Sequence, residues 1–185
     1  MEIKHHFYNR DFYSPNWEIK FLFIGTFNPS GGETVKYYYG RKRNRFWKLL
    51  SEVFRTDLDP NNESFLKDIK HHKIGCIDLI KSVSFDKKYK ELILGKGYKD
   101  SELFKSNIVK TYNTDEILNF IDKNNLNTVY FTNSGKSFNK EQKLELKKIE
   151  DVCKVIYLCS PSPVNRNREN CLEDYIKHIR PSENL

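Results

Sequence analysis

The sequence predicts a three-layer α/β/α protein, in which helices cover both faces of a central, four-stranded, mainly parallel sheet. Two observations predict this fold class. Short apolar runs alternate with helical patterns along the chain, and at least three of those runs are nearly continuous. A continuous apolar run is typical of a strand covered on both faces, whereas a half-exposed strand alternates. The length of 185 residues fits one domain.

Four apolar runs are the predicted strands, and they cover residues 21–24, 74–80, 128–131 and 155–159. The first run ends at Gly25, the third at Thr132 and Asn133, and the last at Ser160 and Pro161. In parallel α/β folds, ligands bind beyond the carboxyl ends of the strands. The loops after these runs are therefore the predicted location of the functional site.

Helical periodicity appears between these runs and after the last one. Apolar side chains fall on one face at 46–54, 114–123 and 172–179, with the spacing of three and four residues that a buried helix face requires. Asn113 and Glu116 have the spacing of a capping box, which predicts that Asn113 caps the helix over 114–123.

The charge balance favours a polyanionic partner. Lys and Arg number 32 against 25 Asp and Glu, a net charge of +7, and aromatic residues make up 14% of the chain. A basic surface of this kind is typical of proteins that bind nucleic acid. No apolar run approaches the roughly 18 residues of a membrane span, and residues 1–10 contain no signal-peptide core. We therefore expect a soluble, cytoplasmic protein.

The cysteines and histidines show no metal-binding pattern. No cysteine belongs to a C-x-x-C pair, and no histidine has ligand spacing. We expect all four cysteines to be reduced core thiols and the histidines to lie on the surface. These residues are Cys76, Cys153, Cys159, Cys171, His5, His6, His71, His72 and His178. No metal site is predicted.

Two segments contain residues suited to DNA binding. Residues 37–47 place basic side chains among tyrosines, a phenylalanine and a tryptophan, a combination that contacts phosphates and stacks on bases. The basic residues are Arg41, Lys42, Arg43 and Arg45. Residues 160–168 follow the last strand with small hydroxyls, two prolines and two arginines. Backbone amides at a helix start in such a loop can hold a phosphate.

The ordered set of segments resembles the uracil-DNA glycosylase superfamily. GTFNPS follows the first strand, YYYGRKRNRFWKLL leads into the first helix, GCIDL lies in the second run, and SPSPVNR follows the last strand. The similarity covers roughly residues 20 to 180. It is closest to the mismatch-specific uracil/thymine glycosylases and the deoxyinosine glycosylases, whose segment ending in N-R-F-W matches residues 44–47.

The resemblance implies one uracil-DNA-glycosylase-like domain over residues 1–185, with a four-stranded parallel sheet between helices. Members of the superfamily flip a base out of the DNA helix and hydrolyse the bond between that base and deoxyribose. The reaction requires no metal or cofactor. The implied substrate is DNA with a deaminated base, uracil or hypoxanthine, and the implied enzyme is a monomer that acts in base excision repair.

The motif correspondence implies which residues bind the base. Tyr39, five positions before Asn44, matches the ring that stacks on the flipped base. Ser160 stands where relatives have a base-contacting Asn or His, which leaves uracil selectivity open. The substrate-binding loop after the first strand adds Gly25, Thr26 and Phe27.

The last motif implies the DNA contacts. Ser162 matches the serine that grips a phosphate, and Arg166 matches the arginine of the motif. Val164 matches the apolar wedge that fills the space left by the base, and it is smaller than the usual Leu. The predicted DNA-binding set also includes Asn165, Arg168, Arg41, Lys42, Arg43 and Arg45.

Two asparagines compete for the catalytic role. In the mismatch-specific enzymes, a fixed spacing separates the catalytic Asn from the stacking ring. Counted back from Tyr39, that spacing places Phe27 at the position of the catalytic Asn. Asn28 therefore takes that role only if the alignment shifts by one residue. The deoxyinosine branch points instead to the Asn of the N-x-F-W segment, here Asn44. Asn44 is also a favoured helix N-cap. Both residues stay candidates.

Two other functions stay open. A catalytically weak relative would bind uracil-containing or damaged DNA without cleaving it, because an Asn is missing at the spaced position in the first motif. A small α/β hydrolase unrelated to DNA is supported by the fold class alone.

Overall fold

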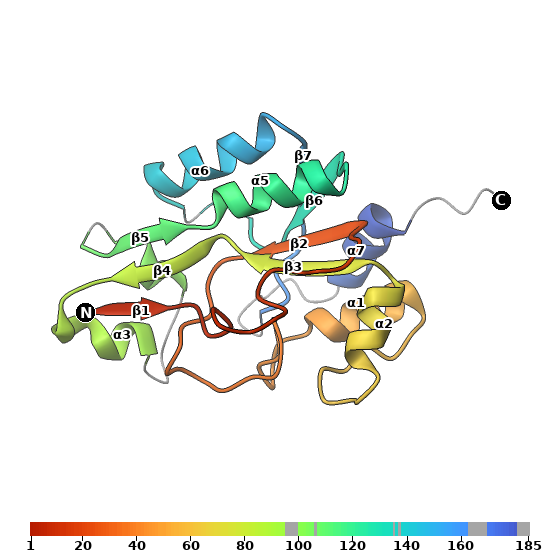
Figure 1. The fold of residues 1–185 in the computed structure, drawn as a ribbon, viewed down its shortest axis with the longest axis horizontal. Coiled ribbons are helices and arrows are strands. Elements are labelled where there is room, and N and C mark those ends of the chain that lie inside the picture. The colour runs from red at the N-terminus through yellow and green to blue at the C-terminus, as the bar shows by residue number, and fades with distance from the viewer. Residues whose placement is uncertain (95–99, 106, 135, 137, 163–169, 181–185) are drawn as a thin grey trace.

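The main sheet has four parallel strands in the order β3-β2-β6-β7 (Figure 1). The structure is a computed structural model, and it describes residues 1–94, 100–105, 107–134, 136, 138–162 and 170–180. The strands are β2 (Phe21–Gly25), β3 (Ile74–Asp78), β6 (Thr128–Phe131) and β7 (Lys154–Tyr157). The predicted four-stranded parallel sheet is confirmed. Because the strands are parallel, their carboxyl ends lie on one edge.

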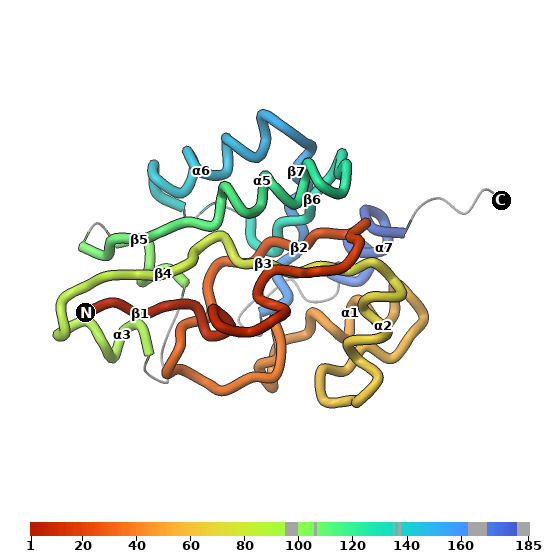
Figure 2. The backbone as a smooth tube through the Cα atoms, in the orientation of Figure 1, coloured from red at the N-terminus to blue at the C-terminus, as the bar shows by residue number. Residues whose placement is uncertain are grey.

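Helices cover both faces of this sheet, which confirms the three-layer prediction (Figures 1 and 2). One face carries α1 (Phe46–Phe54), α2 (Phe65–His71) and α7 (Cys171–Ile179). The other carries α5 (Thr114–Lys123) and α6 (Lys140–Glu150). Within the described ranges, no helix has both the length and the apolar character to cross a membrane.

Successive residues of each central strand enter two separate cores. On β2, Phe23 packs with α1, α2 and α7, whereas Leu22 and Ile24 pack on the side of α5 and α6. Tyr130 and Phe131 of β6 divide in the same way. Since both faces of these strands are buried, both odd and even positions must be apolar, which explains the continuous runs in the sequence.

A second, antiparallel sheet with the order β1-β4-β5 lies beyond the carboxyl end of β3 (Figure 1). It consists of β1 (Glu2–Lys4), β4 (Ile80–Ser84) and β5 (Val109–Tyr112). Between β4 and β5 the chain forms η1 (Lys87–Tyr89), α3 (Lys90–Leu94) and α4 (Asp100–Leu103). The prediction of one strand over 74–80 is wrong, because β3 ends at Asp78 and β4 belongs to this second sheet.

The chain changes sheet at Leu79. The amides of Leu79 and Ile80 donate to the carbonyl oxygens of Gly25 (2.9 Å) and Thr26 (3.0 Å). The loop after β2 therefore supports the start of β4, and the second sheet is built against the loop in which the sequence predicts the functional site.

The capping box lies at a different helix from the predicted one. Asn113 makes no side-chain cap bond to α5. Its amide instead accepts from Tyr13 Oη (2.9 Å) and donates to the carbonyl oxygen of Asp78 (2.7 Å). Asn139 and Gln142 form the reciprocal bonds of a capping box at the start of α6. Asn113 is the N-cap residue of α5, as predicted, but the predicted capping-box bonds are absent because tertiary partners take up its side chain.

Two of the four cysteines behave as predicted. Cys76 and Cys153 are free and buried. Cys159 and Cys171 form a disulfide, so the prediction of a reduced thiol is wrong for this pair. The fold brings the end of β7 and the start of α7 together, with 5.3 Å between the two Cα atoms, a separation suited to a disulfide.

We predict that Leu50→Ala lowers the free energy of unfolding by about 2–5 kcal/mol, because it removes buried contacts and leaves a cavity. Leu50 is fully buried in α1 (0% exposed). Leu144→Ala in α6 is the matched control: Leu144 is 56% exposed, and the effect of its removal is expected within about 0.5 kcal/mol. Urea unfolding measures both variants, and equal effects would contradict this assignment of the core.

Candidate functional site

The loop after β2 forms the centre of the candidate site. Thr26, Phe27 and Asn28 are buried, with exposures of 7%, 5% and 9%. The carbonyl oxygen of Asn28 accepts from the amide of His6 at 2.7 Å, and Nδ2 of Asn133 lies 3.5 Å from Oγ1 of Thr26. The loop is thus held by the N-terminal segment and by the loop after β6. Phe27 packs into the core on the side of α5 and α6.

A guanidinium group contacts the first catalytic candidate. Nη2 of Arg41 donates to Oδ1 of Asn28 at 3.2 Å. This contact joins two segments that the resemblance selects independently, the loop after β2 and the basic run. It also places a permanent positive charge beside the buried amide.

Tyr39 lies across the carboxyl edge of the sheet. Its ring stacks on Phe46, with 3.9 Å between centroids and 26° between planes. Its Oη forms a hydrogen bond of 3.0 Å with Oγ1 of Thr132, the first residue after β6. Burial, with a smaller contribution from the charge of Asp78, raises the pKa of Tyr39 well above its ordinary value. The phenol is therefore neutral at physiological pH.

The other two tyrosines of the run are core residues. Tyr37 and Tyr38 are each 1% exposed and pack in the core formed with α1 and α2. Trp47 donates from Nε1 to the carbonyl oxygen of Tyr38 at 2.7 Å. The expectation that Tyr37 and Tyr38 contribute to base stacking is wrong, since their rings are enclosed by the protein. Tyr39 is the half-buried member of the three.

Asp78 and His5 form a buried pair that the sequence analysis missed. Nδ1 of His5 accepts from the amide of Phe7 at 3.2 Å. Nε2 therefore carries the proton and donates to Oδ2 of Asp78 at 2.7 Å. His5 is 1% exposed, so the prediction of surface histidines is wrong for it. The sequence feature that could have indicated this pair is Asp78 itself, an acidic residue inside the apolar run at 74–80.

The space above Gly25 is filled by two functional groups. A Cβ atom at Gly25 would collide with Oδ1 of Asp78 and would lie 2.8 Å from Oη of Tyr39. The Asp78 carboxylate and the Tyr39 phenol therefore both approach the backbone at the end of β2. Among the described residues, Oδ1 of Asp78 has no hydrogen-bond partner, and 7% of the Asp78 side chain is exposed.

The second catalytic candidate, Asn44, lies at the start of α1. Oδ1 of Asn44 accepts from the amide of Phe46 at 2.9 Å, and Arg45 is the N-cap residue. The amide of Arg45 donates to the carbonyl oxygen of Pro161 at 3.1 Å, which ties α1 to the loop after β7. Lys42 and Arg43 are exposed beside this junction.

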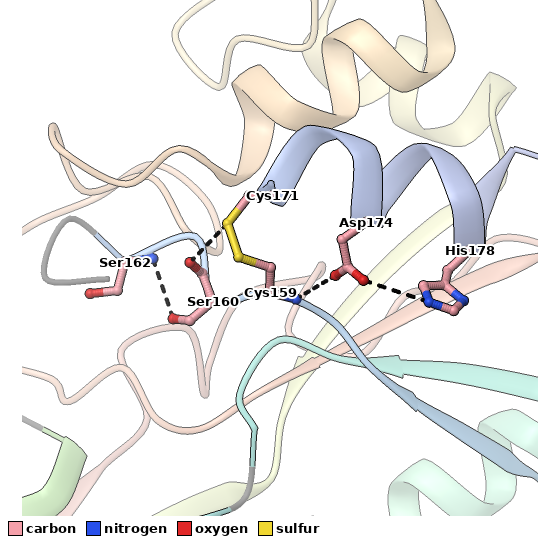
Figure 3. Close-up of a disulfide and its surroundings, with 6 residues drawn as sticks. All are labelled: Cys159, Ser160, Ser162, Cys171, Asp174 and His178. Carbon is pink, nitrogen blue, oxygen red and sulfur yellow. Dashed lines mark hydrogen bonds and ion pairs between the residues drawn. A yellow bond between two sulfur atoms is a disulfide. The ribbon is translucent and has the colours of Figure 1, made fainter. Parts of the chain in front are cut away.

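The described part of the last motif is anchored to α7 (Figure 3). The disulfide links Cys159 to Cys171, and the amide of Cys159 donates to Oδ2 of Asp174 at 2.7 Å. Within the loop, the amide of Ser162 donates to Oγ of Ser160 at 3.4 Å. The remaining predicted residues of this motif lie outside the described residues; they are Val164, Asn165, Arg166 and Arg168.

Two cavities are present in the described part of the structure. One of 430 Å³ is lined at the amino ends of the strands by residues such as Lys20 and Lys73. One of 690 Å³ is lined by α6, Ser134 and Tyr157, the last residue of β7. Neither is lined by a predicted site residue. We place the site at the carboxyl edge because buried polar and charged side chains from five segments converge there. Among the described residues, no three His, Cys, Asp or Glu side chains are grouped to hold a metal ion.

Comparison of the chain with protein-family models and with curated proteins finds no match.

We predict that Gly25→Ala destabilises the protein by about 1–3 kcal/mol, the usual effect of overpacking. The new methyl group would displace the Asp78 carboxylate or the Tyr39 phenol. Gly32→Ala in the same loop is the control, since its nearest neighbour would be the carbonyl oxygen of Pro29 at 3.3 Å. Thermal unfolding of both variants measures the difference. A Gly25→Ala protein as stable as Gly32→Ala would argue against the close packing at Gly25.

Proposed function

We propose that this protein is a DNA glycosylase that flips a deaminated base, uracil or hypoxanthine, out of DNA and hydrolyses its N-glycosidic bond. The observation that carries the proposal is the convergence of the segments that resemble the uracil-DNA glycosylase superfamily. Arg41 contacts Asn28, Asp78 and Tyr39 meet above Gly25, and Arg45 binds the loop after β7. The proposed partner is DNA, and the proposed place of action is the cytoplasm.

The charges around the loop suit both halves of the reaction. Cleavage leaves negative charge on the departing base and oxocarbenium-like positive charge on the sugar. In the proposed mechanism the Arg41 guanidinium stabilises the base, and the Asp78 carboxylate stabilises the sugar. Charges fixed in a buried site are effective because they need no reorganisation when the bond breaks. An asparagine amide, Asn28 or Asn44, positions the attacking water.

Tyr39 is the proposed platform for the flipped base. One face of its ring is covered by Phe46, so the base would stack on the opposite face. Such stacking contributes roughly 1–3 kcal/mol per base. The raised pKa keeps the phenol uncharged, and it therefore adds no repulsion toward an anionic leaving base.

A second candidate function is a weak or inactive relative that binds damaged DNA. The observation in its favour is that both candidate amides already use their oxygen. Oδ1 of Asn28 accepts from Arg41, and Oδ1 of Asn44 accepts from the amide of Phe46. An amide oxygen has two acceptor positions, so one remains at each residue to orient a water molecule. In the DNA-binding relative, the two amides would have only the structural roles that their bonds to Arg41 and Phe46 give them.

Labelled oligonucleotides containing one uracil or one hypoxanthine distinguish the two functions. We expect alkali-labile breaks at the deaminated base and none in an undamaged duplex of the same sequence. Selective retention of the damaged duplex without breaks would instead support the binding protein. If the protein neither cleaves nor retains it, both proposals are wrong.

We predict that Asn28→Ala slows single-turnover cleavage by about a hundredfold or more, the usual effect of removing a group that acts on the transition state. Asn44→Ala is expected to keep most of the rate and to be destabilised by about 1 kcal/mol, because its oxygen supports the start of α1. Cleavage rates and melting temperatures are measured for both.

The reverse pattern, with Asn44→Ala folded and inactive, would assign catalysis to Asn44 and support the deoxyinosine-like alignment. If both variants keep the full rate, neither amide is catalytic.

A further inference from the structure

The second sheet brings two lysines together on one aromatic ring. Lys4 of β1 pairs with Ser82 of β4, and the amide of His5 donates to the carbonyl oxygen of Lys81 at 2.9 Å. This pairing places both ammonium groups over Tyr8. The Nζ atoms of Lys4 and Lys81 lie 4.7 Å and 5.6 Å from the ring centroid of Tyr8.

These two positive charges are not neutralised within the described part of the chain. Neither Lys4 nor Lys81 forms an ion pair with a described carboxylate, whereas Lys73, Lys110 and other lysines do. Each ammonium group lies within the range of about 6 Å at which an aromatic ring attracts a cation. The Tyr8 ring therefore gathers two cations that have no carboxylate partner among the described residues.

The lysine pair adjoins the candidate site. His5, next to Lys4, donates to Asp78, and His6 donates from its amide to Asn28. The carbonyl oxygen of Lys4 accepts from the amide of Ser30 at 2.9 Å. Lys81 follows Asp78 by three residues at the start of the second sheet. The pair therefore lies next to the loop after β2.

We propose that Lys4, Tyr8 and Lys81 form a phosphate-binding surface for the DNA backbone that flanks the flipped nucleotide. This inference rests on the proposed glycosylase function. The two ammonium groups would contact phosphodiester oxygens, and the phenol of Tyr8 can donate one more hydrogen bond. Duplex DNA carries one negative charge per about 1.7 Å of helix axis, so a bound base at the loop brings phosphates to its surroundings.

The test is the salt dependence of binding to a fluorescent duplex with one uracil and to the matched undamaged duplex. Lys4→Gln/Lys81→Gln should reduce the slope of log affinity against log salt by about 1 for each phosphate that is no longer neutralised. We expect affinity to fall about tenfold or more at low salt for both duplexes, without a change in melting temperature. Tyr8→Leu, which removes the ring, should weaken binding in the same way but by less.

The chain offers a matched control. Lys20 lies 5.6 Å from the centroid of Phe21, and Lys70 lies 5.4 Å from that of Trp17. Both are exposed and belong to the amino-terminal edge of the sheet. Lys20→Gln/Lys70→Gln removes the same charge and the same type of cation–ring interaction, and it should leave the salt slope unchanged.

Equal reductions in affinity for the two double variants would overturn the inference, because net charge alone would explain them. Cleavage by the wild type with no effect of Lys4→Gln/Lys81→Gln would also overturn it, while the glycosylase function would stand. Salt-dependent binding that this variant abolishes, in a protein that cleaves nothing, would support the surface and refute the glycosylase. A wild type that binds neither duplex refutes both.

Discussion

At Gly25, the last residue of β2, three segments of the chain meet around a position that can hold no side chain. The Asp78 carboxylate arrives from the neighbouring strand and the Tyr39 phenol from the segment before α1, and both lie where a Cβ atom would be. Tyr39 reaches this point with a φ of 57°, a conformation that costs energy for a residue with a Cβ atom. Its stacking on Phe46 and its bond to Thr132 hold it there.

The buried carboxylate of Asp78 in turn depends on the N-terminal segment. A buried charge is tolerated when hydrogen bonds replace its water, and His5 supplies such a bond to Oδ2. His5 is oriented by the amide of Phe7 and packs against the ring of Tyr38 at 5.3 Å. The second sheet positions this segment through β1. The second sheet therefore helps to hold His5 in place beside Asp78 at the candidate site.

The positive charges near this site come from separate parts of the chain. Arg41 contacts the loop after β2 directly, Lys42 and Arg43 lie exposed before α1, and Lys4 and Lys81 stand on the second sheet. A polyanion that crosses several such groups is bound through the sum of weak, salt-sensitive contacts. The Asp78 carboxylate is a negative charge in the same region, held beside Gly25 by its bond to His5.

The sequence alone was enough to predict the parallel sheet, the helices at 46–54, 114–123 and 172–179, and the edge at which polar loops gather. These features follow from apolar periodicity, which is a local property of the chain. The resemblance to the uracil-DNA glycosylase superfamily selected Tyr39 and Asn28 as candidates, and the basic run selected Arg41. The division of the run at 74–80 between two sheets could not be predicted, since an apolar pattern does not show which strand it pairs with. The same holds for the partners of His5, Asn113 and Cys159. Each of them meets a group distant in sequence, and such contacts depend on how the sheets and helices pack.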